Sequence, residues 1–292
     1  MRKVLRWLGY GIAGIVGLAL IGAAWIWFAS SREMNRAYAA TPERLAPPSA
    51  AQLADAPRQA RVLGCLSCHG DGLRGNEMFD EPGVATVWAP NLTEVAARAS
   101  DQQLAQGIRQ GIGADGRGLW IMPSGLFSRL SDSEVAALIA YIRALPRAGQ
   151  ATPPTSLGPL GRFGIARGAF RPAPATIEEF RVRQPFDVGA EHAVGRRIAA
   201  VTCGECHGPD LSGGSPGPEV IAPGLSVVGA YDPQQFRTLL RTGRPPSGRD
   251  LGLMASVARR DFSHFTDEEI GQIYAYLKAR SQRVQDPPPP ES

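Results

Sequence analysis

The chain has few aromatic residues (7%) and only four cysteines and four histidines among its 292 residues. Charged residues make up 20% of it and the mean hydropathy is −0.13, which together exclude a protein with many membrane spans. No heptad pattern continues over several turns, so a long coiled coil is excluded. No compact region concentrates basic residues, which excludes nucleic-acid binding as the main function.

Glycine and proline are abundant by contrast, with 34 and 25 residues. Their share exceeds that of an average chain but stays below the level typical of disorder. At about 150 residues per domain, the length predicts about two domains. We therefore expect a loop-rich globular protein with two modest cores.

The N-terminus carries a long apolar run. Residues Leu8 to Ala29 are uncharged, and these 22 residues would extend about 33 Å as a helix, enough to span a bilayer. Basic residues precede the run, so the positive-inside rule predicts a cytoplasmic N-terminus. The alternative is a cleaved signal peptide, because Ala37-Tyr38-Ala39 forms a small-residue cleavage site. The length of the run favours a single-pass anchor in a bacterial cytoplasmic membrane, with the remaining chain in the periplasm.

All four cysteines fall in two copies of Cys-x-x-Cys-His. The copies are Cys65 to His69 and Cys203 to His207. This motif is the attachment signature of c-type haem. Two thiols one helical turn apart add to the two vinyl groups of haem, and the adjacent histidine lies under the iron as a ligand. The motifs predict two covalent haems held by Cys65, Cys68, Cys203 and Cys206, with His69 and His207 as iron ligands.

Two other interpretations of the cysteines compete with haem attachment. Four thiolates form a tetrahedral zinc site in some proteins, and a Cys-x-x-Cys pair also serves as a redox dithiol. Neither chemistry requires a histidine directly after both pairs. Zinc ribbons also bring their pairs much closer in sequence than the 134 residues that separate these two cysteine pairs.

The surroundings of the motifs repeat as well. Ala89-Pro90 matches Ala222-Pro223 at an offset of 133, and Arg109 matches Arg241 at an offset of 132. Each copy ends in a predicted helix that begins with a capping box, from Ser131 to Glu134 and from Thr266 to Glu269. The repeat indicates two homologous modules of about 90–100 residues.

From residue 50 to 281 the chain resembles the class I cytochrome c family, whose domain has the haem motif near its first helix and a methionine ligand before its last helix. More narrowly, the stretch from Ala89 to the helix after Ser131 resembles cytochrome subunits of periplasmic alcohol and aldehyde dehydrogenases. Those subunits usually carry three haems, whereas this chain has two motifs.

Two of the five methionines match the family position of the second axial ligand. Met122 lies 53 residues after His69, and Met254 lies 47 residues after His207. Both precede the last helix of their module in loops rich in glycine or proline, rather than on an apolar helical face where methionine usually fills a core. His264 is the rival ligand in the second module.

Three further residues are candidates for haem contacts. Arg109 and Arg241 occupy equivalent repeat positions and are predicted to pair with haem propionates, although a solvated helix surface explains them equally well. Trp120 lies close to Met122 in sequence and is expected either against the haem or in the core.

The sequence thus predicts an all-α fold of two tandem class I cytochrome c domains behind a transmembrane helix. The predicted boundaries are the membrane anchor at 1–30, a stalk at 31–49, domain 1 at 50–146, a linker rich in proline and arginine at 147–186, domain 2 at 187–283 and a disordered tail at 284–292.

With a histidine and a methionine at its two axial positions, each predicted haem iron has no position left to bind a substrate. This favours electron transfer over catalysis. The predicted function is to carry electrons between a dehydrogenase or quinol-oxidising complex and a terminal oxidase or soluble cytochrome. The alternatives are a dihaem enzyme, such as a peroxidase or a small-molecule dehydrogenase, and an integral cytochrome subunit of a larger oxidase or dehydrogenase. An open or histidine-ligated iron would favour the enzyme.

Overall fold

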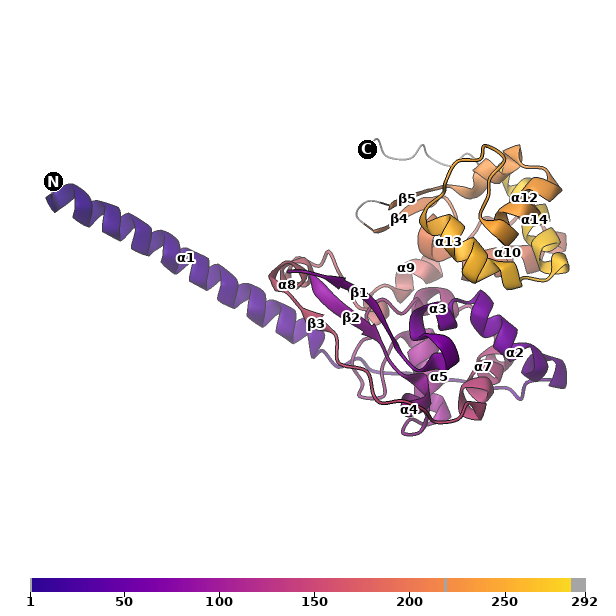
Figure 1. Cartoon of the computed structure of the whole chain (residues 1–292), viewed down its shortest axis with the longest axis horizontal. Coiled ribbons are helices and arrows are strands. Elements are labelled where there is room, and N and C mark those ends of the chain that lie inside the picture. The colour runs from indigo at the N-terminus through magenta and orange to yellow at the C-terminus, as the bar shows by residue number, and fades with distance from the viewer. Residues whose placement is uncertain (1, 218–219, 285–292) are drawn as a thin grey trace.

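The computed structural model describes residues 2–217 and 220–284, and about 58% of it is helical (Figure 1). The helices are α1 (Arg2–Met34), α2 (Ala50–Val62), α3 (Cys65–His69), α4 (Leu92–Ala96), α5 (Asp101–Gln110), α6 (Ser124–Phe127), α7 (Asp132–Ala144), α8 (Pro159–Ala166), α9 (Ile177–Val182), α10 (Ala193–Thr202), α11 (Gly204–His207), α12 (Pro233–Thr242), α13 (Leu253–Arg260) and α14 (Asp267–Ser281). Short 3₁₀ turns are η1 (Asp71–Leu73), η2 (Ala173–Ala175), η3 (Ala190–His192), η4 (Leu225–Ala230) and η5 (Phe262–His264). The strands are β1 (Asn76–Glu81), β2 (Ala85–Ala89), β3 (Ser156–Leu157), β4 (Gly213–Gly217) and β5 (Val220–Pro223).

Helix α1 projects away from the folded part of the chain, as Figure 1 shows. Its mean hydropathy over an 18-residue window is 2.1, and none of that window is buried. Within the described residues it is the one helix long and apolar enough to cross a membrane. The position and length agree with the predicted anchor, while the length and composition alone also fit a signal sequence.

The element order repeats between the two modules, as the sequence predicts. In each module a first helix (α2, α10) leads into a short haem-motif helix (α3, α11), then a β-hairpin, a middle helix (α5, α12) and a last helix (α7, α14). Both predicted capping boxes are present: Ser131 and Thr266 each accept a hydrogen bond from the backbone N–H of the glutamate three residues later. The first and last helices pack together in both modules.

Each module has its own apolar core. The first is built on α7 with residues of α2 and α5, and the second on α14 with residues of α10 and α12. The central side chains of the first core include Val135, Leu138, Ile139 and Leu104, and those of the second include Ile270, Ile273, Leu277 and Phe236. The α7 and α14 side chains among these recur at helical spacing, so each helix buries one face.

Two small antiparallel sheets depart from the predicted all-α fold. Strands β1, β2 and β3 form one, and β4 pairs with β5 in the other. Each hairpin directly follows a haem motif, and α3 contacts β1 while α11 contacts β4 and β5. The all-α prediction is therefore too simple: the glycine-rich segments after the motifs satisfy their backbone groups by pairing with each other.

The segment predicted as a stalk, residues 31–49, runs along the first module. The backbone N–H of Tyr38 donates to the Gly116 carbonyl at 2.9 Å, and that of Thr41 donates to the Gln110 side chain at 2.9 Å. Glu43 forms an ion pair with Arg109 at 3.1 Å. These contacts fix residues 38–43 on the surface of α5 and the loop after it.

The segment predicted as a linker, residues 147–186, has secondary structure of its own and covers the first module. It contains β3, α8, η2 and α9, and β3 pairs with β2. Pro159 occupies the first turn of α8, where its missing N–H costs nothing. Prolines thus occur in the first turns of α8 and η2 within this proline-rich segment.

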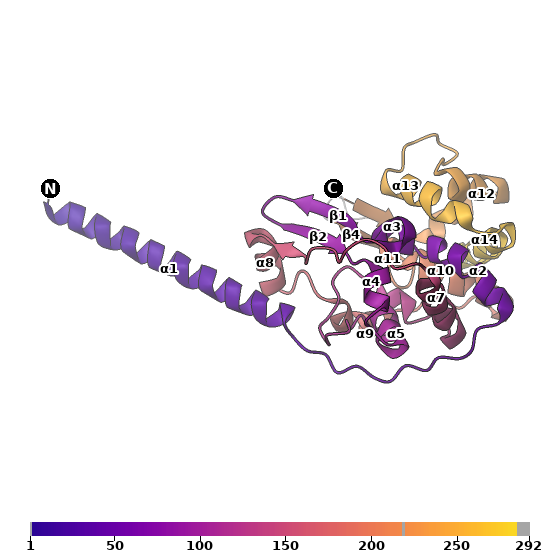
Figure 2. The ribbon, with the colours of Figure 1, turned by 60° about the horizontal axis from the view of Figure 1, so that its bottom comes forward.

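The two modules share a closely packed interface. Figure 2 shows helix α2 of the first module beside the helices of the second module. Val62 of α2 belongs to the second core, and Val201 of α10 belongs to the first. Arg58 forms an ion pair with Glu269 at 2.7 Å, and Ser67 hydrogen-bonds Asp261. The predicted tail, 284–292, lies outside the described residues apart from Val284.

Candidate functional site

The first motif forms a single helical turn between two glycines. Helix α3 places Cys65 and Cys68 three residues apart on one side of that turn. Gly70 follows the histidine with φ 74°, and a Cβ there would come within 2.9 Å of the Gly75 carbonyl oxygen. At the equivalent position Gly208 has φ 82°, and a Cβ would meet Gly213 O at 2.6 Å. Only glycine fits after each motif histidine, because the chain reverses into the hairpin there.

His69 is buried, with 7% of its surface exposed, and its Nδ1 lies 2.8 Å from the Pro90 carbonyl oxygen. Because a carbonyl only accepts, Nδ1 must carry the proton, which leaves Nε2 with a free lone pair. Burial lowers the pKa of His69 although the hydrogen bond to Pro90 opposes the shift. The imidazole is therefore neutral and orientated, as a metal ligand must be.

The second motif repeats this arrangement. His207 Nδ1 lies 2.7 Å from the Pro223 carbonyl oxygen, and burial again lowers the pKa of the imidazole. The sequence repeat had paired Pro90 with Pro223 without assigning them a role. Both prolines contribute the backbone carbonyl that fixes the tautomer of the motif histidine.

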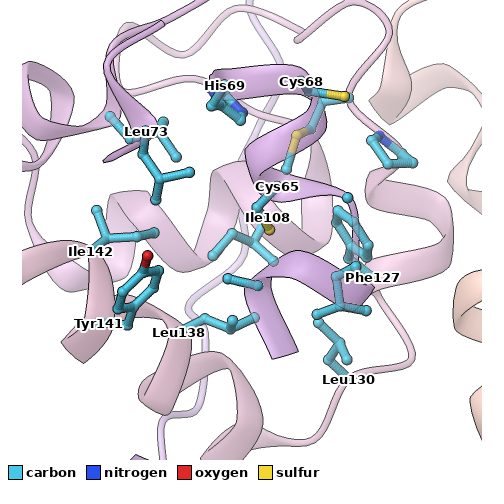
Figure 3. Close-up of a pocket in the computed structure, with 16 residues that line it drawn as sticks. Cys65, Cys68, His69, Leu73, Ile108, Phe127, Leu130, Leu138, Tyr141 and Ile142 are labelled. Atoms are coloured by element: carbon cyan, nitrogen blue, oxygen red, sulfur yellow. The ribbon is translucent and has the colours of Figure 1, made fainter. Parts of the chain in front are cut away.

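Each motif borders an apolar cavity that also contains a methionine. Cys65, Cys68 and His69 line the first together with Met122 and apolar residues of α5, α6 and α7. Figure 3 shows the labelled side chains of this cavity converging on one space. It encloses about 50 Å³, so a large ligand enters it only if side chains move apart. The tight cavity is formed by Leu73, Leu92, Ile108, Phe127, Leu130, Leu138, Tyr141 and Ile142 among others.

The second cavity is larger, at about 470 Å³. Cys203, Cys206 and His207 line it with Met254, which lies in the first turn of α13. His264 is absent from its lining and lies instead at the end of η5, where its backbone carbonyl accepts a hydrogen bond from Arg58 at 3.0 Å. Of the two side chains considered as ligands in this module, Met254 shares the cavity with the motif.

All four thiols are free of disulfides. Burial raises the pKa of Cys65 to about 12 and that of Cys203 to about 11, so both are protonated thiols at neutral pH. Across residues 2–217 and 220–284, no three His, Cys, Asp or Glu side chains gather as a metal cluster. The two pairs of cysteines line separate cavities, whereas a shared tetrahedral zinc site would need all four thiolates around one ion.

The two repeat arginines contact acidic residues. Arg109 lies 2.9 Å from Asp132, and Arg241 lies 2.8 Å from Asp267. Both aspartates are the first residue of the last helix in their module. The repeated arginine thus ties the middle helix to the N-terminus of the last helix, a role that its sequence position does not reveal. Its contact with a haem propionate stays a prediction.

Trp120 lies outside the lining of the first cavity. Its ring packs against Phe170 of the connector, with centroids 5.1 Å apart. In the second module, Arg249 borders the cavity. The structure therefore brings Arg249, rather than Arg241, to the edge of the second motif's cavity.

The residues fit a covalently attached haem at both sites. Paired thiols, a neutral histidine held through Nδ1, a methionine and an apolar wall lie around each cavity. These groups suit a flat apolar cofactor with an iron that takes a nitrogen and a sulfur ligand.

Comparison with known proteins agrees with this chemistry. A family model described as Cytochrome c matches residues 51–146 and 193–281. The chain is 28% identical over 256 residues to the cytochrome c subunit of a quinone alcohol dehydrogenase from Gluconacetobacter polyoxogenes, covering 75% of this chain and 54% of that protein. It is 27% identical over 253 residues to the cytochrome subunit of a fructose dehydrogenase from Gluconobacter japonicus, covering 75% and 51%.

A further relative is named after a different dehydrogenase. The thiosulfate dehydrogenase electron acceptor of Thiomonas intermedia (strain K12) is 29% identical over 231 residues, which cover 79% of this chain and 83% of that protein. The chain spans only about half the length of the alcohol and fructose dehydrogenase subunits. The two segments that match the family model, 51–146 and 193–281, contain both motifs and the residues that line both cavities.

Proposed function

Because the chain belongs to the cytochrome c family, we propose that it is a membrane-anchored dihaem cytochrome c that transfers electrons outside the cytoplasmic membrane. One observation carries the proposal: each Cys-x-x-Cys-His motif shares an apolar cavity with one methionine. In this proposal residues 50–146 and 187–283 are two class I cytochrome c domains.

Each module would hold its haem with the same set of residues. Cys65 and Cys68 would form the thioether bonds of the first haem, and His69 and Met122 would ligate its iron. Cys203, Cys206, His207 and Met254 would do the same for the second. Covalently bound haem supplies an iron that changes its charge by one electron.

The proposed ligands favour an electron carrier over a catalyst. His69 and Met122, and His207 and Met254, would each hold an iron as a pair of ligands, which would leave no open position for substrate or oxygen. The hydrogen bond from Nδ1 to the Pro90 or Pro223 carbonyl holds each imidazole in place during electron transfer. The thioether sulfur raises the potential relative to bis-histidine ligation.

The relatives support a dehydrogenase as the electron donor. Two of them are cytochrome subunits of alcohol and fructose dehydrogenases, and a third is an electron acceptor of thiosulfate dehydrogenase. We propose that a dehydrogenase or quinol-oxidising complex reduces this protein and that a terminal oxidase or soluble cytochrome oxidises it. Purification from native membranes, with identification of the bound subunits, would name the donor.

Intact mass tests the cofactor. The full chain should exceed its polypeptide mass by two haems, and C68A or C206A should each impair attachment at one motif only. A protein without covalent haem would refute the proposed function. A mass increase of one haem would refute the dihaem assignment, and the variant that then loses haem, C68A or C206A, would show which motif is used.

A further inference from the structure

Helix α8 of the connector lies beside the end of α1, as Figure 1 shows. Arg162 Nη1 donates hydrogen bonds to the hydroxyls of Ser30 and Ser31 at 3.0 and 3.2 Å. The Arg162 guanidinium also lies 3.7 Å from the centre of the Trp27 ring. These contacts fix the position of α8 along α1 at residues 27–31.

Those residues lie at one end of the apolar run of α1. The run from Leu8 to Ala29 is followed by Arg32 and Glu33, and its length of about 33 Å matches a hydrocarbon core of about 30 Å. Trp27 and Phe28 are 60% and 69% exposed, at the position where aromatic side chains meet the headgroups. A membrane around α1 would therefore have its surface at the level of α8.

Helix α8 has three faces: one is buried in the module, one contacts α1, and one is apolar and exposed. Ile165 is buried in the module (4% exposed), and Arg162 contacts α1. Leu160 and Phe163, three residues apart and so on one face, are 64% and 41% exposed. In the described parts of the chain this face has no cover, and large exposed apolar side chains that lie together mark an interaction surface.

We propose that α8 is a second membrane contact, and that Leu160 and Phe163 enter the boundary between headgroups and acyl chains beside α1. The inference rests on the proposed anchor. Continuity with α1 supports a lipid surface rather than a protein partner, because exposed apolar side chains of both helices lie at the same level.

The charges around α8 suit a headgroup region. Arg167 lies 5.3 Å from the Phe163 ring centre, and Arg162 spans from α8 to the last turns of α1. Asp80 and Glu81 lie on the neighbouring hairpin, whose Gly83 carbonyl accepts a hydrogen bond from Leu160 N–H at 2.9 Å. With both signs of charge present, apolar insertion rather than attraction to anionic lipid is the main interaction, so uncharged lipid suffices.

Photolabelling from lipid tests the proposal in the full-length haem protein. The protein is reconstituted in phosphatidylcholine vesicles that contain a phosphatidylcholine with a diazirine close to its ester groups, and adducts are located by peptide mass spectrometry. We expect adducts in α1 and in the peptide with Leu160 and Phe163. The peptide with Leu53, which is 45% exposed on α2, should remain unlabelled.

The double variant L160Q/F163Q should lose the α8 adduct and keep the α1 adducts, and the matched control L53Q should keep both. Equal haem content and equal far-UV circular dichroism confirm that each variant is folded. Labelling of α1 without α8 in the native protein would overturn the inference and leave the proposed anchor intact. Loss of both adducts would instead refute the anchor, and the α8 contact with it.

Discussion

At the residue scale, Met254 and His264 are the two candidate ligands for the iron of the proposed second haem. Met254 lies in the cavity with His207, while the backbone of His264 is engaged by Arg58. The two choices differ in chemistry, since a thioether stabilises ferrous iron relative to a second imidazole. Their redox and spectral signatures separate them without a crystal of the haem protein.

We predict that M122H and M254H each lower one step of a two-step redox titration. The decrease should be on the order of 100 mV, a fraction of the range of about 0.8 V that axial ligands span. Each variant should also lose the methionine-to-iron absorption band of one haem. H264A serves as the control and should change neither. If H264A alters the spectrum and M254H does not, the ligand of the second haem is His264.

The cysteines and motif histidines are predictable from sequence because covalent attachment fixes their spacing. The partners of the histidines are not, since Pro90 and Pro223 contribute only a backbone carbonyl and lie 21 and 16 residues away. The repeat shows that an arginine occupies the same position in both modules, as Arg109 does in the first. It does not tell whether that arginine pairs with a haem propionate or with Asp132, because either carboxylate forms the same kind of ion pair.

Local patterns account for some elements better than others. Helices α7 and α14 follow from a capping box and a periodic apolar face, and both are observed. The hairpins escape prediction because β1 is exposed at most positions and β4 begins with two glycines, so neither has the alternation of a half-buried strand. Helix α8 begins at a proline within a segment whose composition indicates a loop.

Helix α11 begins with a glycine that touches the other module. A Cβ on Gly204 would come within 2.6 Å of Leu126 Cδ2, and Leu126 is 2% exposed in the first core. We predict that G204A destabilises the haem protein by about 1–3 kcal/mol, the usual cost of overpacking a core. Denaturant unfolding measures the change.

The matched control for this substitution is Gly271 in α14. No atom lies within 4 Å of a Cβ placed there. Because alanine is the better helix former, G271A should leave stability unchanged or raise it by up to about 1 kcal/mol. Equal destabilisation by both variants would contradict the close contact between Gly204 and Leu126.

At the scale of the whole molecule, one arginine joins three parts of the chain. Arg129, which follows α6, donates to the carbonyls of Ala200 and Pro209 in the second module and of Phe180 in the connector, at 3.0, 3.2 and 2.8 Å. Burial lowers its pKa, although nearby Asp210 partly offsets the effect. Removal of the guanidinium takes a charged donor from the Ala200 and Pro209 carbonyls, while the Phe180 carbonyl keeps the Gln184 side-chain amide as a donor at 2.7 Å.

We predict that R129A destabilises the protein by about 2–4 kcal/mol, because several buried carbonyls lose a charged donor at once. Calorimetry should show one transition for the native protein and two for the variant, since the modules then unfold separately. R98A is the control: Arg98 is 68% exposed, and its loss should change stability by less than about 0.5 kcal/mol. A single unshifted transition in R129A would contradict the prediction.

The ion pair between Arg58 and Glu269 makes the same interface sensitive to acid. Burial alone would raise the pKa of Glu269, but the hydrogen bonds and charge of Arg58 more than offset it and hold the pKa below its ordinary value. The stabilisation is therefore complete above the unfolded pKa of about 4.3. It is lost as the pH falls through the lower folded pKa, because the unfolded state binds the proton first.

E269Q should lower stability at neutral pH by roughly 2 kcal/mol, the value of a hydrogen-bonded charged pair. The difference from the native protein should shrink in acid below about pH 4. Denaturant unfolding across this pH range measures both effects. E178Q is the control, because Glu178 is 75% exposed in its ion pair with Arg181. A difference that stays constant into acid would show that the Glu269 carboxylate is not the titrating group.

The contacts of residues 38–43 with the first module also determine how the protein meets its redox partners. If some fifteen residues formed a flexible linker, the module could occupy many positions and orientations above the bilayer and could reach partners over a wide area. In the structure, residues 38–43 lie along α5, and Arg162 hydrogen-bonds Ser30 near the end of α1. If α1 spans a membrane as proposed, both cavities would keep a constant height and tilt above the bilayer. Encounters would then depend on lateral diffusion of membrane partners and on collisions with partners in solution, because the modules could not swing.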